Sequence, residues 1–216
     1  MAALIATRDL SPVELTEAHL DRIDSVNERL NAIVVPAPDA LDRAKDAERA
    51  VTSGEPLGPL HGVPYTIKDS IDVAGYPTTS GSLLTSRTPA ETDAPVVARI
   101  RNAGGVLLGK TNTPEFTLWW ETDNRVFGRS NNPWNADRTT GGSSGGEAAA
   151  ISSGMSPLGI GSDSGGSIRV PAAYCNIFGL KATHGRVPIT GHVPYTLLQA
   201  THVGPSLHCS GFLYYP

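Results

Sequence analysis

The chain has 216 residues, of which 39% are hydrophobic and 18% are charged, and its net charge is −4. This composition excludes a disordered chain, and the lack of any basic block argues against nucleic acid or a membrane surface as a partner. No apolar run approaches the ~20 residues that span a membrane. Cys175 and Cys209 show neither disulfide nor metal-ligand spacing, so we expect a cytoplasmic protein without metal or other cofactor.

The first half of the chain alternates between helical and strand patterns. Ser11, followed by Pro12 and Glu14, predicts the start of a helix that runs to about residue 26. This alternation predicts an α/β fold. Further elements are expected as a strand over 32–35, a helix over 39–52, a strand over 63–67, a helix over 94–103 and a strand over 106–108.

Lys68 follows the apolar strand pattern of residues 63–67. It has two interpretations. It can be a solvated residue at the end of a strand, or a lysine in a partly dry site whose pKa is lowered so that it acts as a base. The strand pattern alone slightly favours the solvated lysine.

Residues 104–111, GGVLLGKT, match the G-x-x-x-x-G-K-[ST] pattern of a phosphate-binding loop. Such a loop needs a strand before the first glycine and a helix directly after the lysine. Here a helical pattern comes first, residues 106–108 favour a strand, and Pro114 follows soon after. Nucleotide binding is therefore the weakest of the functional hypotheses.

The tryptophans Trp119, Trp120 and Trp134 lie close together in the sequence. They can pack in the core, or they can line an apolar pocket for the acyl group of a substrate, and aromatic side chains serve both purposes. The sequence favours neither interpretation. Residues 113–116 can form a short helix just before the first of these tryptophans.

Two glycine- and serine-rich clusters, 141–146 and 161–167, dominate the second half of the chain. Between them, residues 148–151 favour a helix and residues 157–160 a buried strand, so the glycines do not belong to a flexible linker. A short helix is expected near Ser167 and a strand over 178–182. Serine hydroxyls beside glycine-rich backbone suit nucleophilic catalysis with an oxyanion hole, although such clusters are more often simple turns.

These stretches together resemble the amidase signature family. The resemblance runs from Ser11 to about Pro205 and includes residues 58–75, 104–116, 131–135 and above all 141–188. It implies a mixed β-sheet flanked by helices. It also implies an amidase that cleaves the C–N bond of a small linear carboxamide.

The family uses a Ser–cis-Ser–Lys triad. The resemblance implies Ser167 as nucleophile, Ser143 after a cis peptide bond as bridging serine, and Lys68 as base. A buried neutral lysine can replace histidine in this role, and the nearest histidines in motif terms, His61 and His184, flank turns. The oxyanion is expected to be bound by backbone amides of Ser164, Gly165, Gly166 and the nucleophile, in a loop shaped by Ser162 and Asp163.

The resemblance implies that residues 1–205 are the N-terminal part of one amidase domain. Residues 206–216 lack a helical face or a capping pattern and form an off-pattern tail. We therefore expect a truncated chain that is weakly active or inactive, with unpaired strand edges that promote aggregation. Two alternatives stay open. One is the glutamine-hydrolysing subunit of a tRNA-dependent amidotransferase, although residues 116–123 are more similar to free-standing amidases, and the other is a non-catalytic fragment.

Overall fold

The computed structural model describes residues 1–85, 87–194 and 202–207. Within these residues, six strands form one sheet in the order β1-β3-β2-β4-β6-β5. Strand β2 runs parallel to both of its neighbours, whereas the β1–β3, β4–β6 and β5–β6 pairs are antiparallel. The expected mixed α/β sheet is therefore confirmed. The strands are β1 (Ile33–Pro36), β2 (Pro64–Lys68), β3 (Val106–Thr111), β4 (Leu158–Asp163), β5 (Phe178–Gly179) and β6 (His202–Leu207).

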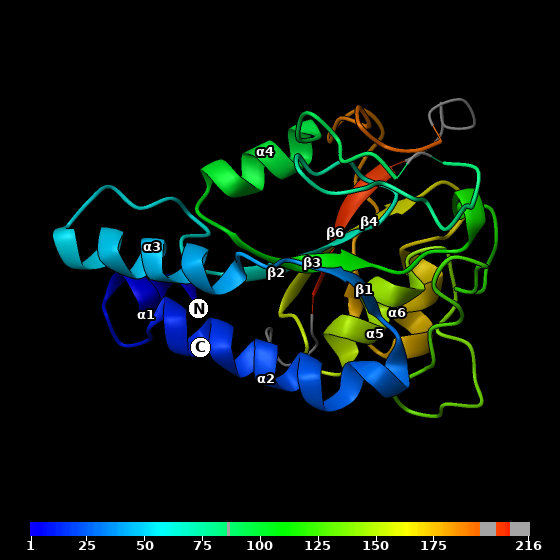
Figure 1. Cartoon of the computed structure of the whole chain (residues 1–216), viewed down its shortest axis with the longest axis horizontal. Helices are drawn as coiled ribbons and strands as arrows, with labels where there is room; N and C mark the ends of the chain where they lie inside the picture. The colour runs from blue at the N-terminus through cyan, green and yellow to red at the C-terminus, as the bar shows by residue number, and fades with distance from the viewer. Residues whose placement is uncertain (86, 195–201, 208–216) are drawn as a thin grey trace.

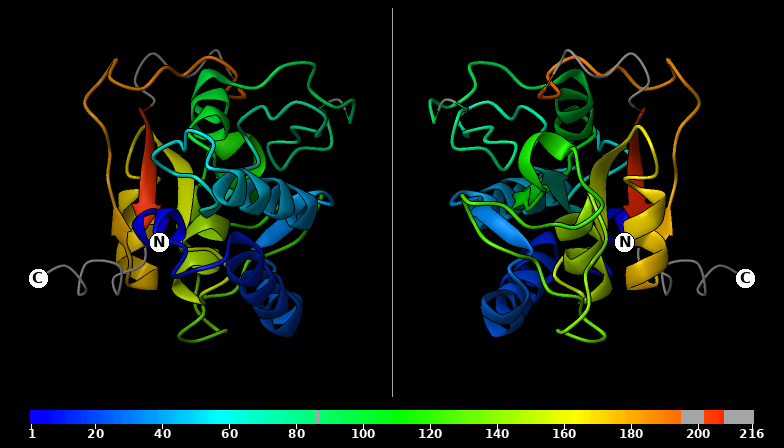
Figure 2. Two further views of the ribbon diagram at one scale, coloured as in Figure 1. Left: turned by 90° about the vertical axis from the view of Figure 1, so that its left-hand side faces the viewer. Right: turned by 90° about the vertical axis from the view of Figure 1, so that its right-hand side faces the viewer.

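Helices cover both faces of this sheet. Helix α4 lies over one face, while α2 and α5 lie on the other, and α3 packs beside α2 (Figures 1 and 2). Burial on both faces explains why β2, β3 and β4 are buried along nearly their whole length rather than at alternate positions. The helical elements are α1 (Ala2–Ala6), α2 (Pro12–Leu30), α3 (Ala40–Ser53), α4 (Pro95–Asn102), the 3₁₀ turn η1 (Glu115–Thr117), α5 (Gly145–Ser152) and α6 (Arg169–Cys175).

The start of α2 follows its capping signal. The Ser11 hydroxyl accepts hydrogen bonds from the backbone amides of Val13 and Glu14 at 3.1 and 3.2 Å, which satisfies two donors that the first turn of a helix leaves free. The helix ends at Leu30, four residues later than its apolar pattern predicts, because Asn31 adopts the left-handed conformation (φ 49°) that closes a helix.

Helix α5 is buried on nearly every side and packs against five strands of the sheet. Its first turn contains Gly145 and Gly146, and a side chain at Gly146 would collide with backbone atoms of Asn112 and Ala32. These glycines let the start of α5 approach the carboxyl ends of the central strands. The segment that begins α5 therefore lies directly beside the end of β2.

The end of the described chain differs from its sequence pattern. The strand expected over 178–182 is limited to β5, Phe178–Gly179, and a strand that we did not predict, β6, pairs antiparallel with the whole of β4. Ser206 and Leu207, which we assigned to the tail, belong to β6. The paired residues lie 39 to 49 positions apart in the sequence, from 163 with 202 to 158 with 207, so no local pattern reveals the pairing. The remainder of the tail, 208–216, lies outside the described residues.

Candidate active site

The parallel strands β2 and β4 bring Lys68 and Ser162 to the same edge of the sheet. Their register pairs Ile67 with Ile160, so the last residue of β2 lies beside the carboxyl end of β4. This edge, where parallel strands end, is the usual place for active sites in open α/β sheets. Lys68 is completely buried there, and its Nζ donates a hydrogen bond to Ser162 Oγ at 3.0 Å.

Ser143 reaches Lys68 from the segment that begins α5. Its Oγ lies 2.7 Å from Lys68 Nζ, within hydrogen-bond distance. The Gly142–Ser143 peptide bond is cis, as the family resemblance implies. A side chain at Gly142 would meet the backbone of Trp119 and Glu121, so only glycine lets residues 119–121 pack against this bond.

Ser167 lies in the second glycine-rich cluster, which the structure places next to the first. Its backbone carbonyl accepts a hydrogen bond from the amide of Ser144 at 3.0 Å, so the chain at Ser167 lies beside the chain at Ser143. Ser167 is 8% exposed and lines a cleft of about 330 Å³. The bridging and nucleophilic positions predicted from sequence are therefore close in the fold.

The loop before Ser167 is organised by Asp163. Burial disfavours ionisation of this carboxyl, but hydrogen bonds from Arg169 and from the amides of Ile168 and Gly166 outweigh burial and lower its pKa to about 2. Since the Gly166 amide donates to Asp163 Oδ1 at 2.8 Å, it can serve an oxyanion only if that bond opens. The predicted oxyanion role of Gly166 therefore requires this bond to shift when the oxyanion forms.

Lys68 shares its surroundings with a second buried ionisable group, Glu147. Desolvation lowers the pKa of Lys68 to about 7, although the negative charges of Asp163 and Glu147 oppose this shift. Desolvation also raises the pKa of Glu147 to about 7, against hydrogen bonds from Thr66 and Thr111. The solvated interpretation of Lys68 is therefore wrong, and a neutral amine is accessible near neutral pH.

His192 is a neighbour of this site that the sequence did not reveal. Its Nε2 lies 2.8 Å from Ser162 Oγ and 3.1 Å from Ser70 Oγ. Burial, with the nearby Lys68, lowers the pKa of His192 to about 3, so the imidazole is neutral. By contrast, His61 bonds to the Ala47 carbonyl far from Lys68. No functional pattern in the sequence includes His192.

The lysine of the phosphate-loop pattern, Lys110, is a structural residue. It lies inside strand β3, is completely buried, and forms an ion pair with Asp69 at 3.3 Å. Its Nζ also donates to the Pro77 carbonyl and to Thr78 Oγ1. The segment from residue 106 is a strand, so the geometry of a phosphate-binding loop is absent from this part of the described chain.

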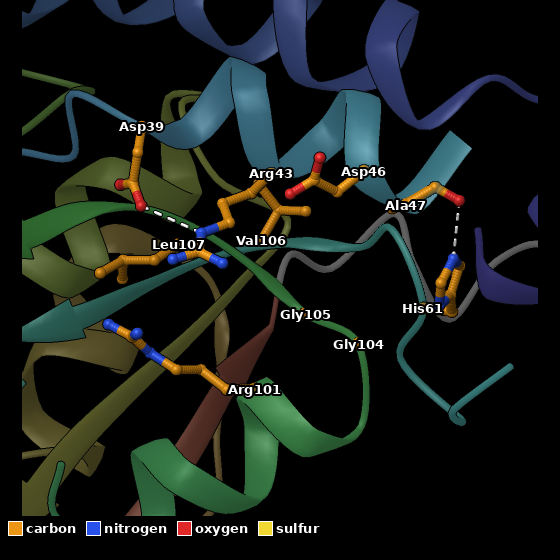
Figure 3. Close-up of a pocket in the computed structure, with 10 residues that line it drawn as sticks. All are labelled: Asp39, Arg43, Asp46, Ala47, His61, Arg101, Gly104, Gly105, Val106 and Leu107. Carbon is orange, nitrogen blue, oxygen red and sulfur yellow. Dashed lines mark hydrogen bonds and ion pairs between the residues drawn. The ribbon is translucent and has the colours of Figure 1, made fainter. Parts of the chain in front are cut away.

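A second cavity lies at the opposite end of the central strands. It measures about 260 Å³ and is lined at the amino end of β3 by Val106 and the glycines before it (Figure 3). Lys68, by contrast, lies at the carboxyl end of the parallel strand β2. In the cavity, Arg43 is ion-paired with Asp39. The described residues that line this cavity include no nucleophile, and its Arg43 is neutralised by a carboxylate. This cavity is therefore a poor candidate for the catalytic site.

The tryptophans do not contribute to the core. Trp119 and Trp120 are 65% and 62% exposed, and together with Leu118 they line the cleft at Ser167. Trp134 is also exposed, and its Nε1 donates to the carbonyl of Cys175 away from this cleft. The pocket interpretation is therefore supported for the first two tryptophans and not for the third.

Two further properties of the described chain bear on the kind of site. In residues 1–85, 87–194 and 202–207, no three His, Cys, Asp or Glu residues cluster so that they could hold a metal ion. None of the helices in the same residues is both long and apolar enough to cross a membrane.

Comparison with known proteins identifies the family. The family model described as Amidase matches residues 14–212, and the chain belongs to this family. It is 48% identical over 191 residues to an acylamidase of Rhodococcus erythropolis, covering 88% of this chain and 40% of that protein. It is 44% identical over 197 residues to a glutamyl-tRNA(Gln) amidotransferase subunit of Salinispora tropica, covering 91% of this chain and 40% of that protein.

A solved structure agrees with this assignment. The crystal structure of a bacterial aryl acylamidase of the amidase signature family superposes with a TM-score of 0.86 at 35% identity, over 95% of this chain and 43% of that chain. The chain thus spans about 40% of the length of the curated relatives that it matches. Family and fold are established by these similarities.

Proposed function

We propose that this chain is an amide hydrolase that acts through a serine acyl-enzyme. The observation that carries the proposal is the buried Lys68, whose Nζ lies 2.7 Å from Ser143 Oγ and whose pKa is about 7. Serine is a weak nucleophile that needs a base in hydrogen-bond reach, and an amine with this pKa can be that base near neutral pH. The amide-hydrolysing relatives support the same activity.

In the proposed mechanism, Lys68 takes a proton from Ser143, which takes one from Ser167. The Ser167 Oγ attacks the carbonyl carbon, and the C–O bond forms as the carbonyl becomes an oxyanion. Backbone amides of the preceding loop, at Ser164, Gly165 and Ser167, stabilise that charge. The proton returns through Ser143 to the leaving nitrogen as the C–N bond breaks, and water then hydrolyses the ester.

The cleft beside Ser167 favours an amide with an apolar acyl or aryl group. Leu118, Trp119 and Trp120 present an apolar wall directly next to the nucleophile, and apolar walls with few polar groups are typical of small-molecule sites. The linear small-molecule amide is thus the proposed partner. The free, buried Cys175 supports the proposed cytoplasmic location.

A second candidate is the glutamine-hydrolysing subunit of a tRNA-dependent amidotransferase. The 44% identity to the amidotransferase subunit of Salinispora tropica favours it. The two candidates differ in substrate and assembly. An acylamidase-like chain releases product from an apolar anilide or alkyl amide without partners, whereas the amidotransferase subunit hydrolyses glutamine and co-purifies with other subunits.

The nucleophile can be tested with a fluorophosphonate probe, which reacts covalently with activated serines. We expect labelling of the protein at Ser167 and loss of labelling in Ser167→Ala. The matched control Ser53→Ala, on the exposed end of α3, should label like the unsubstituted chain. Labelling that persists in Ser167→Ala would contradict the nucleophile assignment. An unsubstituted chain that does not react would favour a non-catalytic role.

A further inference from the structure

A buried hydrogen-bonded chain extends from Lys68 away from the serine pair. Lys68 Nζ contacts Ser162 Oγ at 3.0 Å, and Ser162 Oγ contacts His192 Nε2 at 2.8 Å. All three residues are at most 2% exposed. The proposed proton relay uses neither Ser162 nor His192, so their function needs a separate explanation.

The number of protons on Lys68 determines the direction of its hydrogen bond with Ser162. A neutral amine has two N–H groups and one lone pair, and as a base it must direct the lone pair at the hydroxyl of Ser143. Ser162 Oγ should then accept an N–H from Lys68. If the Ser162 hydroxyl instead donated to Lys68, it would occupy the lone pair that Ser143 needs.

His192 offers an acceptor for the hydroxyl proton of Ser162. Its Nε2 lies within hydrogen-bond distance of two hydroxyls, Ser162 at 2.8 Å and Ser70 at 3.1 Å, and an unprotonated Nε2 accepts from the nearer one. The ring proton is then on Nδ1, which is buried and has no hydrogen-bond partner among the described residues, so the tautomer decides the direction of the bond. The imidazole is neutral because burial lowers its pKa to about 3. The backbone that carries the ring is anchored, since residue 192 forms a β-bridge with Ile71 and the Val193 amide donates to the Ser70 carbonyl at 2.7 Å.

We propose that His192 is a positioning residue that accepts the proton of the Ser162 hydroxyl and thereby keeps the lone pair of Lys68 directed at Ser143. The inference rests on the proposed function, because it assigns the direction of the hydrogen bonds behind the catalytic base. His192 itself does not touch substrate and exchanges no proton in the reaction. It acts through Ser162.

The protonation of His192 can be tested without turnover. In protein with ¹⁵N-labelled histidine at neutral pH, two-bond ¹H–¹⁵N correlations distinguish the two tautomers, and His192→Gln identifies the signals of this residue by their loss. The proposal requires a proton on Nδ1 and a bare, accepting Nε2. A proton on Nε2, or a doubly protonated ring, would overturn it.

A double-mutant cycle tests the effect on Ser167, using the second-order rate of fluorophosphonate labelling. His192→Leu should slow labelling by about tenfold, a fraction of what a general base contributes, and His192→Gln should stay within about threefold because its carboxamide can still accept at the Nε2 position. In a Ser162→Ala background, His192→Leu should add no further loss, since the two residues act as one unit.

The outcomes separate the inference from the proposed function. The inference is overturned if the losses in labelling rate of Ser162→Ala and His192→Leu multiply in the double variant. It is also overturned if His192→Gln is labelled as slowly as His192→Leu. Either result would show that His192 has only a structural role. Thermal melts of all variants identify any that fail to fold. If the unsubstituted protein is not labelled at Ser167, the proposed function fails, while the tautomer measurement still decides the direction of the hydrogen bond from Ser162.

Discussion

Lys68 acquires its chemistry from burial more than from any single neighbour. Removing its ammonium group from water lowers the pKa to about 7, while the carboxylates of Glu147 and Asp163 favour the charged form. The adjacent His192 is neutral and adds no positive charge. Because Lys68 and Glu147 titrate in the same range, the pH profile belongs to the pair rather than to either group.

The pH dependence of labelling tests this balance. Only the neutral form of Lys68 is a base, so the labelling rate should rise with pH through about 7, as the lysine loses its proton. Glu147→Gln removes a negative charge that raises the pKa of Lys68, so the rise should move to lower pH. The exposed Glu17→Gln on α2 is the matched control and should leave the profile unchanged. An unmoved or higher transition in Glu147→Gln would refute this electrostatic explanation.

At the scale of elements, the site depends on how closely α5 approaches the sheet. Gly145 and Gly146 carry no side chain, and this brings the turn with Ser143 onto the end of β2. The glycine-rich cluster therefore has a packing function in addition to its chemical one. A clash there would be with backbone atoms of Asn112, which cannot rotate away.

Gly146→Ala should consequently destabilise the protein. We expect the free energy of unfolding to fall by about 1–3 kcal/mol, the usual cost of overpacking a filled interior. Gly165→Ala is a suitable control for stability, because a side chain there would meet no atom within 4 Å. Urea denaturation of both variants makes the comparison. A Gly146→Ala protein as stable as the control would show that α5 can move away from the sheet.

At the scale of the whole fold, the two outermost strands of the sheet that the described residues form are β1 and β5. Apolar side chains near β5 are exposed, with Phe178 at 50% and Leu180 at 62%. Exposed strand edges with apolar side chains promote association between chains. We therefore expect any self-association of the chain to occur at the β5 edge of the sheet.

Light scattering over a range of protein concentrations tests this location. Leu180→Lys should reduce self-association, because a charge near an edge strand opposes pairing with another chain. Leu84→Lys is the matched control: it adds the same charge at an exposed leucine in a loop. Equal effects of the two substitutions would indicate that net charge, rather than the β5 edge, controls association.

Sequence patterns predicted most of the elements but only part of the site. Local signals were sufficient for α2, whose cap is a serine, and for the buried strand β2. Lys68 and the serines at 143 and 167 lie in long motifs, so resemblance located them. Strand β6 and His192 were missed because each depends on a contact between segments distant in the sequence, His192 with Ser162 and β6 with β4.

The most direct test of the central claim is to isolate the acyl-enzyme. The protein is mixed with an apolar anilide, quenched in acid within the first turnovers, and digested for peptide mass mapping. We predict a peptide that carries the acyl group on Ser167, and no such peptide in Lys68→Ala. Acylation of another residue, or product release with no acylated Ser167 at any quench time, would contradict the proposed mechanism.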